Sequence, residues 1–176
     1  MPIARYKITF FIFFLILVVG FAVWMNLGST EPSDIGVASA VQFSGERYGN
    51  SEFNFSFEKP EGYNIGEFEE GDSYVVLAQP KEGQTGFQII ITLLGAEDTE
   101  ITKDIIVSEI PGIKIENDKT FSIGRSKGLI FESDNSAFNG TSAEAWFMYK
   151  GNLYQISGYG DSMSAIEQIL KTWEWN

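Results

Sequence analysis

The hydrophobic pattern begins with one long apolar segment. Residues 8–27 read ITFFIFFLILVVGFAVWMNL, and Thr9 and Asn26 are their only polar members. As a helix rising about 1.5 Å per residue, the segment would be about 30 Å long, which matches the hydrocarbon thickness of a bilayer. We therefore predict that residues 8–27 form a transmembrane helix.

The charges on either side of this segment predict its orientation. Arg5 and Lys7 precede it, whereas Glu31 and Asp34 follow it. Because basic residues are retained on the cytoplasmic side, we expect residues 1–7 in the cytoplasm and the rest of the chain outside it. The predicted product is a single-pass protein of the cell membrane, held in the lipid bilayer by a signal-anchor.

A cleavable signal peptide is the alternative interpretation. Ala38-Ser39-Ala40 has the small-x-small pattern of a cleavage site, and cleavage there would leave a chain beginning at Val41. However, the apolar run is longer than an ordinary signal core, and Glu31, Pro32 and Asp34 separate it from the tripeptide. We favour the uncleaved anchor.

Residues 28–49 mix small, polar and turn-forming residues without helical or strand periodicity, so we predict a linker there. From Phe53 the pattern becomes alternating, with Phe53, Phe55 and Phe57 on one face of a half-buried strand. Lys59-Pro60-Glu61-Gly62 then has the residues of a type I turn. A single folded domain is expected over residues 50–176.

Further strands are predicted at residues 74–78 and 87–94. The second is apolar on both faces, which indicates a central strand covered by helices. Two hairpins follow: residues 121–123 with 129–131 around the Gly124–Gly128 turn, and residues 143–149 with 153–159 around Gly151-Asn152.

Two helices are expected between and after these strands. Ile101, Ile105, Ile106 and Ile110 recur at helical spacing after Thr99, and Pro111-Gly112 ends that run. Near the C-terminus, Ser164 and Glu167 have the spacing of a capping box. Met163, Ile166, Leu170 and Trp173 line one side of that helix, which we interpret as a packing face without a ligand role. Alternation at Trp173-Glu174-Trp175 predicts a terminal strand.

The fold class is therefore α+β, an antiparallel sheet with flanking helices. Its opening pattern, Phe53-x-Phe55-x-Phe57-x-x-Pro60-x-Gly62-Tyr63, and its closing residues resemble the PsbP-like fold. The closing residues are Tyr154, Ile156, Ile166, Ile169, Leu170, Trp173 and Trp175. The resemblance covers residues 50–176 and implies an α/β/α sandwich, as in the extrinsic PsbP subunit of photosystem II and many short bacterial surface proteins.

The chain departs from that pattern at Lys59, where an aromatic often precedes the proline, and at Tyr63, where Trp is common. The resemblance implies no single activity, and no metal-binding residue can be matched.

The composition of the chain limits the classes of partner that we expect. Without Arg5 and Lys7, the chain has ten basic and 24 acidic residues, which gives a net charge of −14. Such a domain repels phosphate backbones, so we expect no nucleic-acid partner. Cationic partners, or solubility alone, remain as explanations of the acidic surface.

The chain contains no His and no Cys. Ser-His-Asp and Cys-His sites, disulfides and the usual zinc sites are therefore excluded. Carboxylate chemistry remains, with candidates at Glu67, Glu69, Glu70 and Asp72 and at Glu97, Asp98 and Glu100. The same acidic loops could also offer oxygen ligands to calcium, although Glu97-Asp98-Thr99-Glu100 lacks an EF-hand pattern.

Three further motifs give weaker indications of function. Ser126-Lys127 has the residue types of a Ser-Lys hydrolase, but adjacent strand residues point to opposite faces, which favours an exposed basic turn. Gly124-x-x-x-Gly128 lacks the Gly-Lys-Ser/Thr ending of a phosphate loop. Asn54 and Asn139 match the glycosylation acceptor pattern, and Asn139 is the better candidate because Asn54 falls in a predicted strand.

We assign no catalytic, cofactor-binding or metal-binding residue from the sequence. The expected function is a membrane-anchored extracytoplasmic binding or accessory domain, not an enzyme, with an envelope or membrane protein as partner. The alternatives are a carboxylate-dependent hydrolase of exported polymers and a calcium-binding surface module.

Overall fold

The computed structural model describes residues 42–81, 86–95, 99–134, 138 and 140–176. The predicted transmembrane segment 8–27, the cytoplasmic residues 1–7 and the Ala38-Ser39-Ala40 tripeptide lie outside these residues. Among the helices that are described, none is long and apolar enough to cross a membrane.

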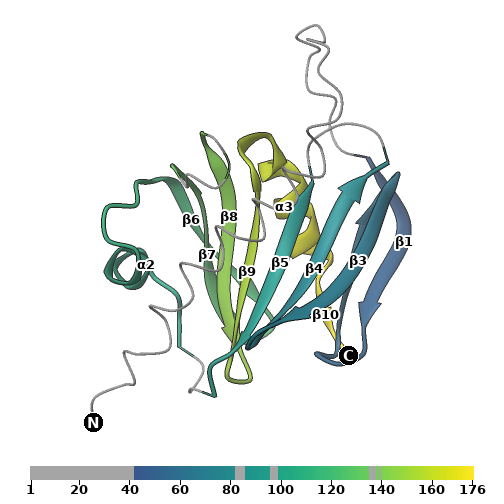
Figure 1. The fold of residues 1–176 in the computed structure, drawn as a ribbon, viewed down its shortest axis with the longest axis horizontal. Helices are drawn as coiled ribbons and strands as arrows, with labels where there is room; N and C mark the ends of the chain where they lie inside the picture. Colours follow the sequence, from purple (N-terminus) through teal and green to yellow (C-terminus); the bar gives the residue numbers. More distant parts are fainter. Residues whose placement is uncertain (1–41, 82–85, 96–98, 135–137, 139) are drawn as a thin grey trace, which may run out of the picture.

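Two antiparallel sheets form the body of the domain (Figure 1). The larger one has seven strands in the order β3-β4-β5-β9-β8-β7-β6. Its strands are β3 (Tyr63–Glu70), β4 (Ser73–Pro80), β5 (Phe87–Leu93), β6 (Ile115–Ile123), β7 (Ser126–Ser133), β8 (Ser142–Tyr149) and β9 (Asn152–Tyr159). The smaller sheet has the order β1-β2-β10, with β1 (Phe43–Asn50), β2 (Phe55–Pro60) and β10 (Glu174–Trp175).

The helices lie on opposite faces of the large sheet. Helix α3 (Met163–Thr172), which follows the 3-10 turn η2 (Gly160–Ser162), packs with the small sheet on one face. The shorter α2 (Lys103–Glu109) packs on the other face over β7, β8 and β9. The α+β class with a mainly antiparallel sheet and few helices is thus confirmed, and β5 lies inside the sheet as predicted.

Aromatic rings fill the space between the two sheets. Phe55 and Trp173 stack with ring centroids 4.4 Å apart, and Phe147 stacks on Tyr154 at 5.0 Å. Phe55, Phe147 and Tyr154 are each at most 1% exposed. Since complete burial of such a side chain contributes about 1.5–3 kcal/mol, this cluster is a main source of stability. Trp173 has the packing position that its helical stripe predicts.

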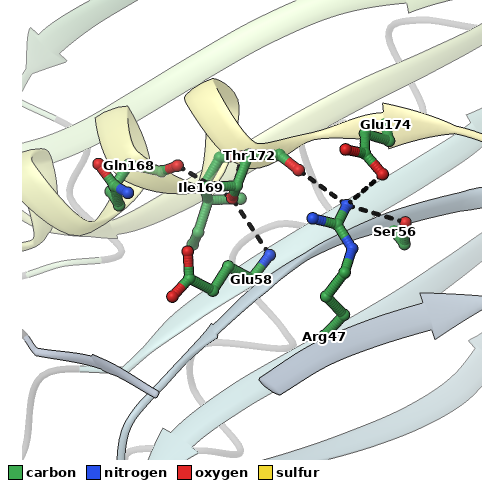
Figure 2. Close-up of polar contacts among 7 residues, drawn as sticks. All are labelled: Arg47, Ser56, Glu58, Gln168, Ile169, Thr172 and Glu174. Carbon is green, nitrogen blue, oxygen red and sulfur yellow. Dashed lines mark hydrogen bonds and ion pairs between the residues drawn. The ribbon is translucent and has the colours of Figure 1, made fainter. Parts of the chain in front are cut away.

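A polar network joins the end of α3 to the small sheet (Figure 2). Nη2 of Arg47 donates to Ser56 Oγ at 3.0 Å and to the Thr172 carbonyl at 2.9 Å, and it forms an ion pair with Glu174 at 3.0 Å. The Glu58 amide donates to Thr172 Oγ1 at 3.1 Å. The guanidinium thus satisfies a carbonyl at the C-terminal end of the helix, where positive charge is favoured.

The N-terminal boundary of the domain differs from the prediction. β1 begins at Phe43, inside the segment predicted as linker, and pairs with β2 at Phe43 and from Arg47 to Asn50, with a register shift between them. Its polar, exposed residues hid the strand, because only its last residue is buried. Similarly, β3 lies at an edge of the sheet and is mostly exposed, so its alternation is weak and no strand was predicted there.

The predicted turns are close but shifted. The strand predicted from Phe53 is β2, which begins at Phe55 and ends at Pro60. The turn after it is therefore Glu61-Gly62, and not the predicted Lys59-Pro60-Glu61-Gly62. The β6–β7 turn is Gly124-Arg125, and Gly128 lies in β7, where an added Cβ would come within 2.4 Å of the Trp146 carbonyl oxygen.

The β8–β9 turn is Lys150-Gly151 rather than Gly151-Asn152. Both of its residues have positive φ, 50° and 78°, as a tight primed hairpin turn requires. Asn152 is already the first residue of β9.

The helix ends also need correction. Ser162, rather than Ser164, is the N-cap of α3, and its side chain makes no capping hydrogen bond, so the predicted capping box is wrong. The preceding 3-10 turn feeds the chain directly into the helix, which explains the earlier start. At α2 the cap is Thr102, whose hydroxyl accepts from the Ile105 amide at 3.4 Å. The stop at Pro111-Gly112 and the terminal strand at Glu174–Trp175 are confirmed.

Candidate functional site

A hollow of about 580 Å³ opens where the β6–β7 and β8–β9 turns meet the C-terminal strand. It is lined by Thr99, Glu100, Gly124, Arg125, Ser126, Lys127, Met148, Tyr149, Lys150 and Trp175. Its volume is in the range typical of small-ligand and short-peptide sites. We refer to it as the basic hollow.

Three of the ten basic residues after residue 7 lie in this hollow. Arg125 and Lys127 come from the β6–β7 hairpin, and Lys150 from the β8–β9 turn. Lys127 forms an exposed ion pair with Glu100 at 3.4 Å. Within the part of the chain that the structure describes, no carboxylate forms an ion pair with Arg125 or Lys150. The hollow is therefore a local positive site on a strongly acidic domain.

Two aromatic side chains form an apolar wall of the same hollow. Tyr149 and Trp175 stack with centroids 3.7 Å apart and an angle of 16° between the rings. The Lys150 Nζ lies 5.2 Å from the centroid of the Tyr149 ring, a cation–π distance. The stack fixes the C-terminal strand against the hairpin, so the hollow is assembled from distant parts of the sequence.

The predicted candidates of this region are only partly brought together. Ser126 and Lys127 are the first residues of β7 and not a turn as predicted. Ser126 is buried, whereas Lys127 is exposed and bound to Glu100, so the two do not form a Ser-Lys pair. Glu97, Asp98 and Asn139 lie outside the described residues. The prediction that Asn54 lies in a strand is wrong. Asn54 lies in the turn before β2 and has a positive φ of 54°.

A second cluster contains the predicted candidate Glu67. Its carboxylate accepts hydrogen bonds from the hydroxyl groups of Tyr48 and Tyr74. The Asn50 amide donates to both of these hydroxyls, at 3.2 and 3.1 Å. β1 supplies Tyr48 and Asn50, β3 supplies Glu67, and β4 supplies Tyr74, so the cluster ties the small sheet to the edge of the large one.

The cluster shifts the titration of its members. Burial, together with the hydrogen bond to Glu67, raises the pKa of Tyr74 to about 12 and raises the pKa of Tyr48 as well. Partial burial alone would raise the pKa of Glu67, but the hydrogen bonds from Tyr48, Tyr74 and Asn50 outweigh it and lower the pKa. These shifts keep Glu67 ionised and both tyrosines protonated near neutral pH.

The other acidic candidates do not join this cluster. Glu69 and Glu70 continue β3 and are paired across the ladder with Tyr74 and Ser73, and Asp72 lies in the following turn. Among the described residues, no group of three or more His, Cys, Asp or Glu side chains is arranged to hold a metal ion.

A buried carboxylate that the sequence reasoning missed lies on the α2 face of the sheet. Glu144 is 1% exposed. Its Oε1 accepts from Ser133 Oγ at 2.8 Å and from Ser142 Oγ at 2.7 Å, and its Oε2 accepts from Trp146 Nε1 at 2.9 Å. We call these four residues the Glu144 network. The signal was present in the sequence, because Glu144 is the only charge in the apolar run of β8.

The missed residues of the basic hollow had a weaker signal. Arg125 and Lys150 are single exposed cations in turns, and their convergence with Trp175 depends on the pairing of β7 with β8 and of β10 with β2. No spacing within the sequence encodes these contacts.

Comparisons with known proteins give likeness in structure alone. No protein-family model matches the chain, and no curated protein does. The solution structure of cyanobacterial PsbP (CyanoP) from Synechocystis sp. PCC 6803 is similar, with a TM-score of 0.53 and 12% identity over 86% of this chain and 99% of that one.

The crystal structure of the Saccharomyces cerevisiae Ran-binding protein Mog1p is also similar, with a TM-score of 0.50 and 8% identity over 76% of this chain and 96% of that one. Both identities are too low to transfer an activity. The arrangement of sheets and helices, together with the match to PsbP over 86% of the chain, shows that this protein has a PsbP-like fold.

Proposed function

We propose that the protein is a membrane-anchored, extracytoplasmic binding or accessory domain that holds a partner in the basic hollow. The observation that carries the proposal is the convergence of Arg125, Lys127 and Lys150 in one hollow of a chain with twice as many acidic as basic residues. Exposed cations gathered in one hollow, two of which form no ion pair with any described residue, are available to an anionic group of a ligand.

The membrane placement rests on the sequence. Residues 8–27 are long enough to span a bilayer, and the flanking charges favour a cytoplasmic N-terminus. In this arrangement the anchor is a single helix and the lipid bilayer is a permanent partner. The envelope or membrane protein held by the domain is the second partner.

The direction of β1 separates the hollow from the point where the described part of the chain begins. The chain enters the described domain at Phe43, which pairs with Pro60, whereas Asn50 and Trp175 both pair with Phe55 at the other end of β2. An eight-residue strand is about 26 Å long. The basic hollow, which Trp175 lines, therefore lies at the opposite end of β2 from Phe43, near which the described part of the chain begins.

A binding role accounts for the polar clusters better than catalysis does. The Glu67 carboxylate is occupied by two phenol groups, and the Glu144 carboxylate is buried among donors. Hydrolysis by paired carboxylates would need two such groups facing each other across a cleft. The similar Mog1p structure is named as a Ran-binding protein, which is a precedent for protein binding by this fold.

Photocrosslinking of the full-length chain in native membranes tests the proposal. A photoreactive amino acid at Thr99, on the wall of the hollow, is compared with one at Glu116, at the opposite end of β6. We expect a discrete crosslinked partner from Thr99 and none from Glu116. In a second measurement on intact cells, we expect external protease to digest the C-terminal domain.

Two results would overturn the proposal. One is equal or absent crosslinking from the two positions. The other is a membrane-extracted chain that begins at Val41, which would refute the anchor.

A further inference from the structure

We propose that the basic hollow recognises the carboxylate side chains of an acidic, extended peptide segment of its partner. This inference rests on the proposed function and names the chemistry of the ligand. It is carried by three observations: two cations that form no ion pair with any described residue, the spacing of the three cations at the ends of neighbouring strands, and the ring stack that lines the same hollow.

The charge state of the hollow favours an anionic ligand. Arg125 and Lys150 are exposed and form no ion pair with any residue in the described part of the chain, while Lys127 shares one carboxylate, that of Glu100. The guanidinium of Arg125 presents a planar fork that matches a carboxylate in two hydrogen bonds. An incoming carboxylate would find its partners already gathered in one place.

The spacing of the cations favours several separate charges over one compact group. Arg125 and Lys127 are two residues apart, in the β6–β7 turn and in β7, and Lys150 directly follows β8, the strand that pairs with β7. Neighbouring strands lie about 5 Å apart, and residues two apart in a strand are about 7 Å apart. An extended peptide with acidic side chains at alternate positions repeats the same spacing of about 7 Å.

The aromatic wall favours a peptide over a sugar acid. Sugars bind to open, flat aromatic faces, but Tyr149 and Trp175 each have one face taken by the other at 3.7 Å, and Lys150 lies over the Tyr149 ring. The stack therefore supplies an apolar side wall that contacts aliphatic stems, and the three cations supply the recognition.

The rest of the surface confines an acidic ligand to this place. With a net charge of −14 after residue 7, the domain repels an acidic peptide everywhere except where the cations gather. Binding should consequently be specific in position, modest in affinity and sensitive to salt.

The experiment uses the full chain in nanodiscs of phosphatidylcholine. A fluorescent peptide Glu-Ser-Glu-Ser-Glu is titrated by anisotropy at low salt, with Gln-Ser-Gln-Ser-Gln as the uncharged control. The variants are Arg125→Glu and Lys150→Met in the hollow, and Lys171→Glu as the matched charge change on α3, outside the hollow.

We expect the acidic peptide to bind and the uncharged peptide not to bind. Arg125→Glu should weaken binding about tenfold and Lys150→Met about threefold, whereas Lys171→Glu should stay within twofold of the parent chain. Unchanged thermal melting of the variants shows that the domain has remained folded.

Three results would overturn the inference: no binding of the acidic peptide, equal weakening by Lys171→Glu, or displacement of the peptide by trigalacturonate or inorganic phosphate at a lower concentration than by unlabelled peptide. If the peptide fails while the Thr99 crosslink persists, the ligand assignment is wrong and the binding function stands. If the crosslink is absent as well, the proposed function falls with it.

Discussion

The basic hollow and the Glu144 network place charge on the same sheet in opposite ways. In the network, one carboxylate is 1% exposed and accepts hydrogen bonds from three side chains. In the hollow, three cations are exposed and share a single ion pair among the described residues. A charge whose contacts are complete stabilises the fold, whereas charges whose contacts are incomplete are available to a partner.

The two faces of the large sheet repeat this contrast. Toward α3 and the small sheet, the face is apolar and aromatic. On the other face, Gln88, Gln155 and Ser157 are buried near Glu144, and Ser157 pairs across the ladder with both Gln88 and Glu144. The hydrogen bonds to Glu144 make the second face depend on hydrogen-bond geometry as well as on apolar burial.

The largest effect is expected from Glu144→Ala. Removing the carboxylate takes away the acceptor of three buried donors, Ser133, Ser142 and Trp146, and should lower the free energy of unfolding by about 3 kcal/mol. Urea denaturation followed by Trp fluorescence measures it. Glu69→Ala, an exposed change on the edge strand, is the control and should stay within about 0.5 kcal/mol. Equal effects of the two variants would remove the distinction between complete and incomplete charge contacts.

A smaller effect is expected from pH at the Tyr48–Glu67–Tyr74 cluster. The folded pKa of Tyr74 is raised from 10.0 to about 12, so its stabilising contribution is complete below pH 10 and is lost as the pH rises toward 12. The pKa of Glu67 is lowered from 4.5, so its contribution is present above that pH and is lost as the pH falls below it.

Thermal melting as a function of pH, with ultraviolet absorbance of tyrosinate, measures both transitions. Glu67→Gln should flatten the acid limb and bring the tyrosine titration closer to pH 10. An unaltered profile in this variant would show that the cluster does not couple the two sheets.

A still smaller effect is expected from Arg47→Met, which removes the contacts of Arg47 with Ser56, Thr172 and Glu174 that Figure 2 draws. The Thr172 carbonyl loses its donor, and an ion pair with 39% and 65% exposed side chains is lost, so we expect about 1 kcal/mol. Lys114→Met breaks the more exposed pair with Asp134 and should change the unfolding free energy by less than half as much. If the two variants match, the link between α3 and the small sheet contributes nothing measurable.

The smallest effect is expected from a substitution in the basic hollow itself. Glu100→Gln removes the carboxylate that occupies Lys127 and should strengthen binding of the acidic peptide two- to threefold, while melting stays unchanged. The anisotropy titration measures it. Weaker binding in this variant would indicate that Glu100 belongs to the ligand contacts and does not compete with them.

The fold could be predicted further than the site. Alternation and helical spacing predict the packing positions of Phe55, Phe57 and Trp173, because burial imposes those periods directly on the sequence. β1 and β3 do not, because each is largely exposed and carries no apolar repeat. Lys150-Gly151 shows why turn positions shift by one residue: positive φ at a lysine has no signature in composition.

The basic hollow could not be predicted for a different reason. Arg125, Lys150 and Trp175 meet only through the registers of β7 with β8 and of β10 with β2, which are properties of the folded chain. Glu144 could have been recognised, since a lone charge inside an apolar strand requires partners.

Capture of the natural partner through the hollow is the most direct test of the account. With the photoreactive group at Thr99 in native membranes, the yield of the crosslinked partner is compared between Arg125→Glu and Lys171→Glu, which change the net charge equally. The account predicts loss of the crosslink in the first variant and its retention in the second. Equal yields would show that the cations of the hollow do not hold the partner.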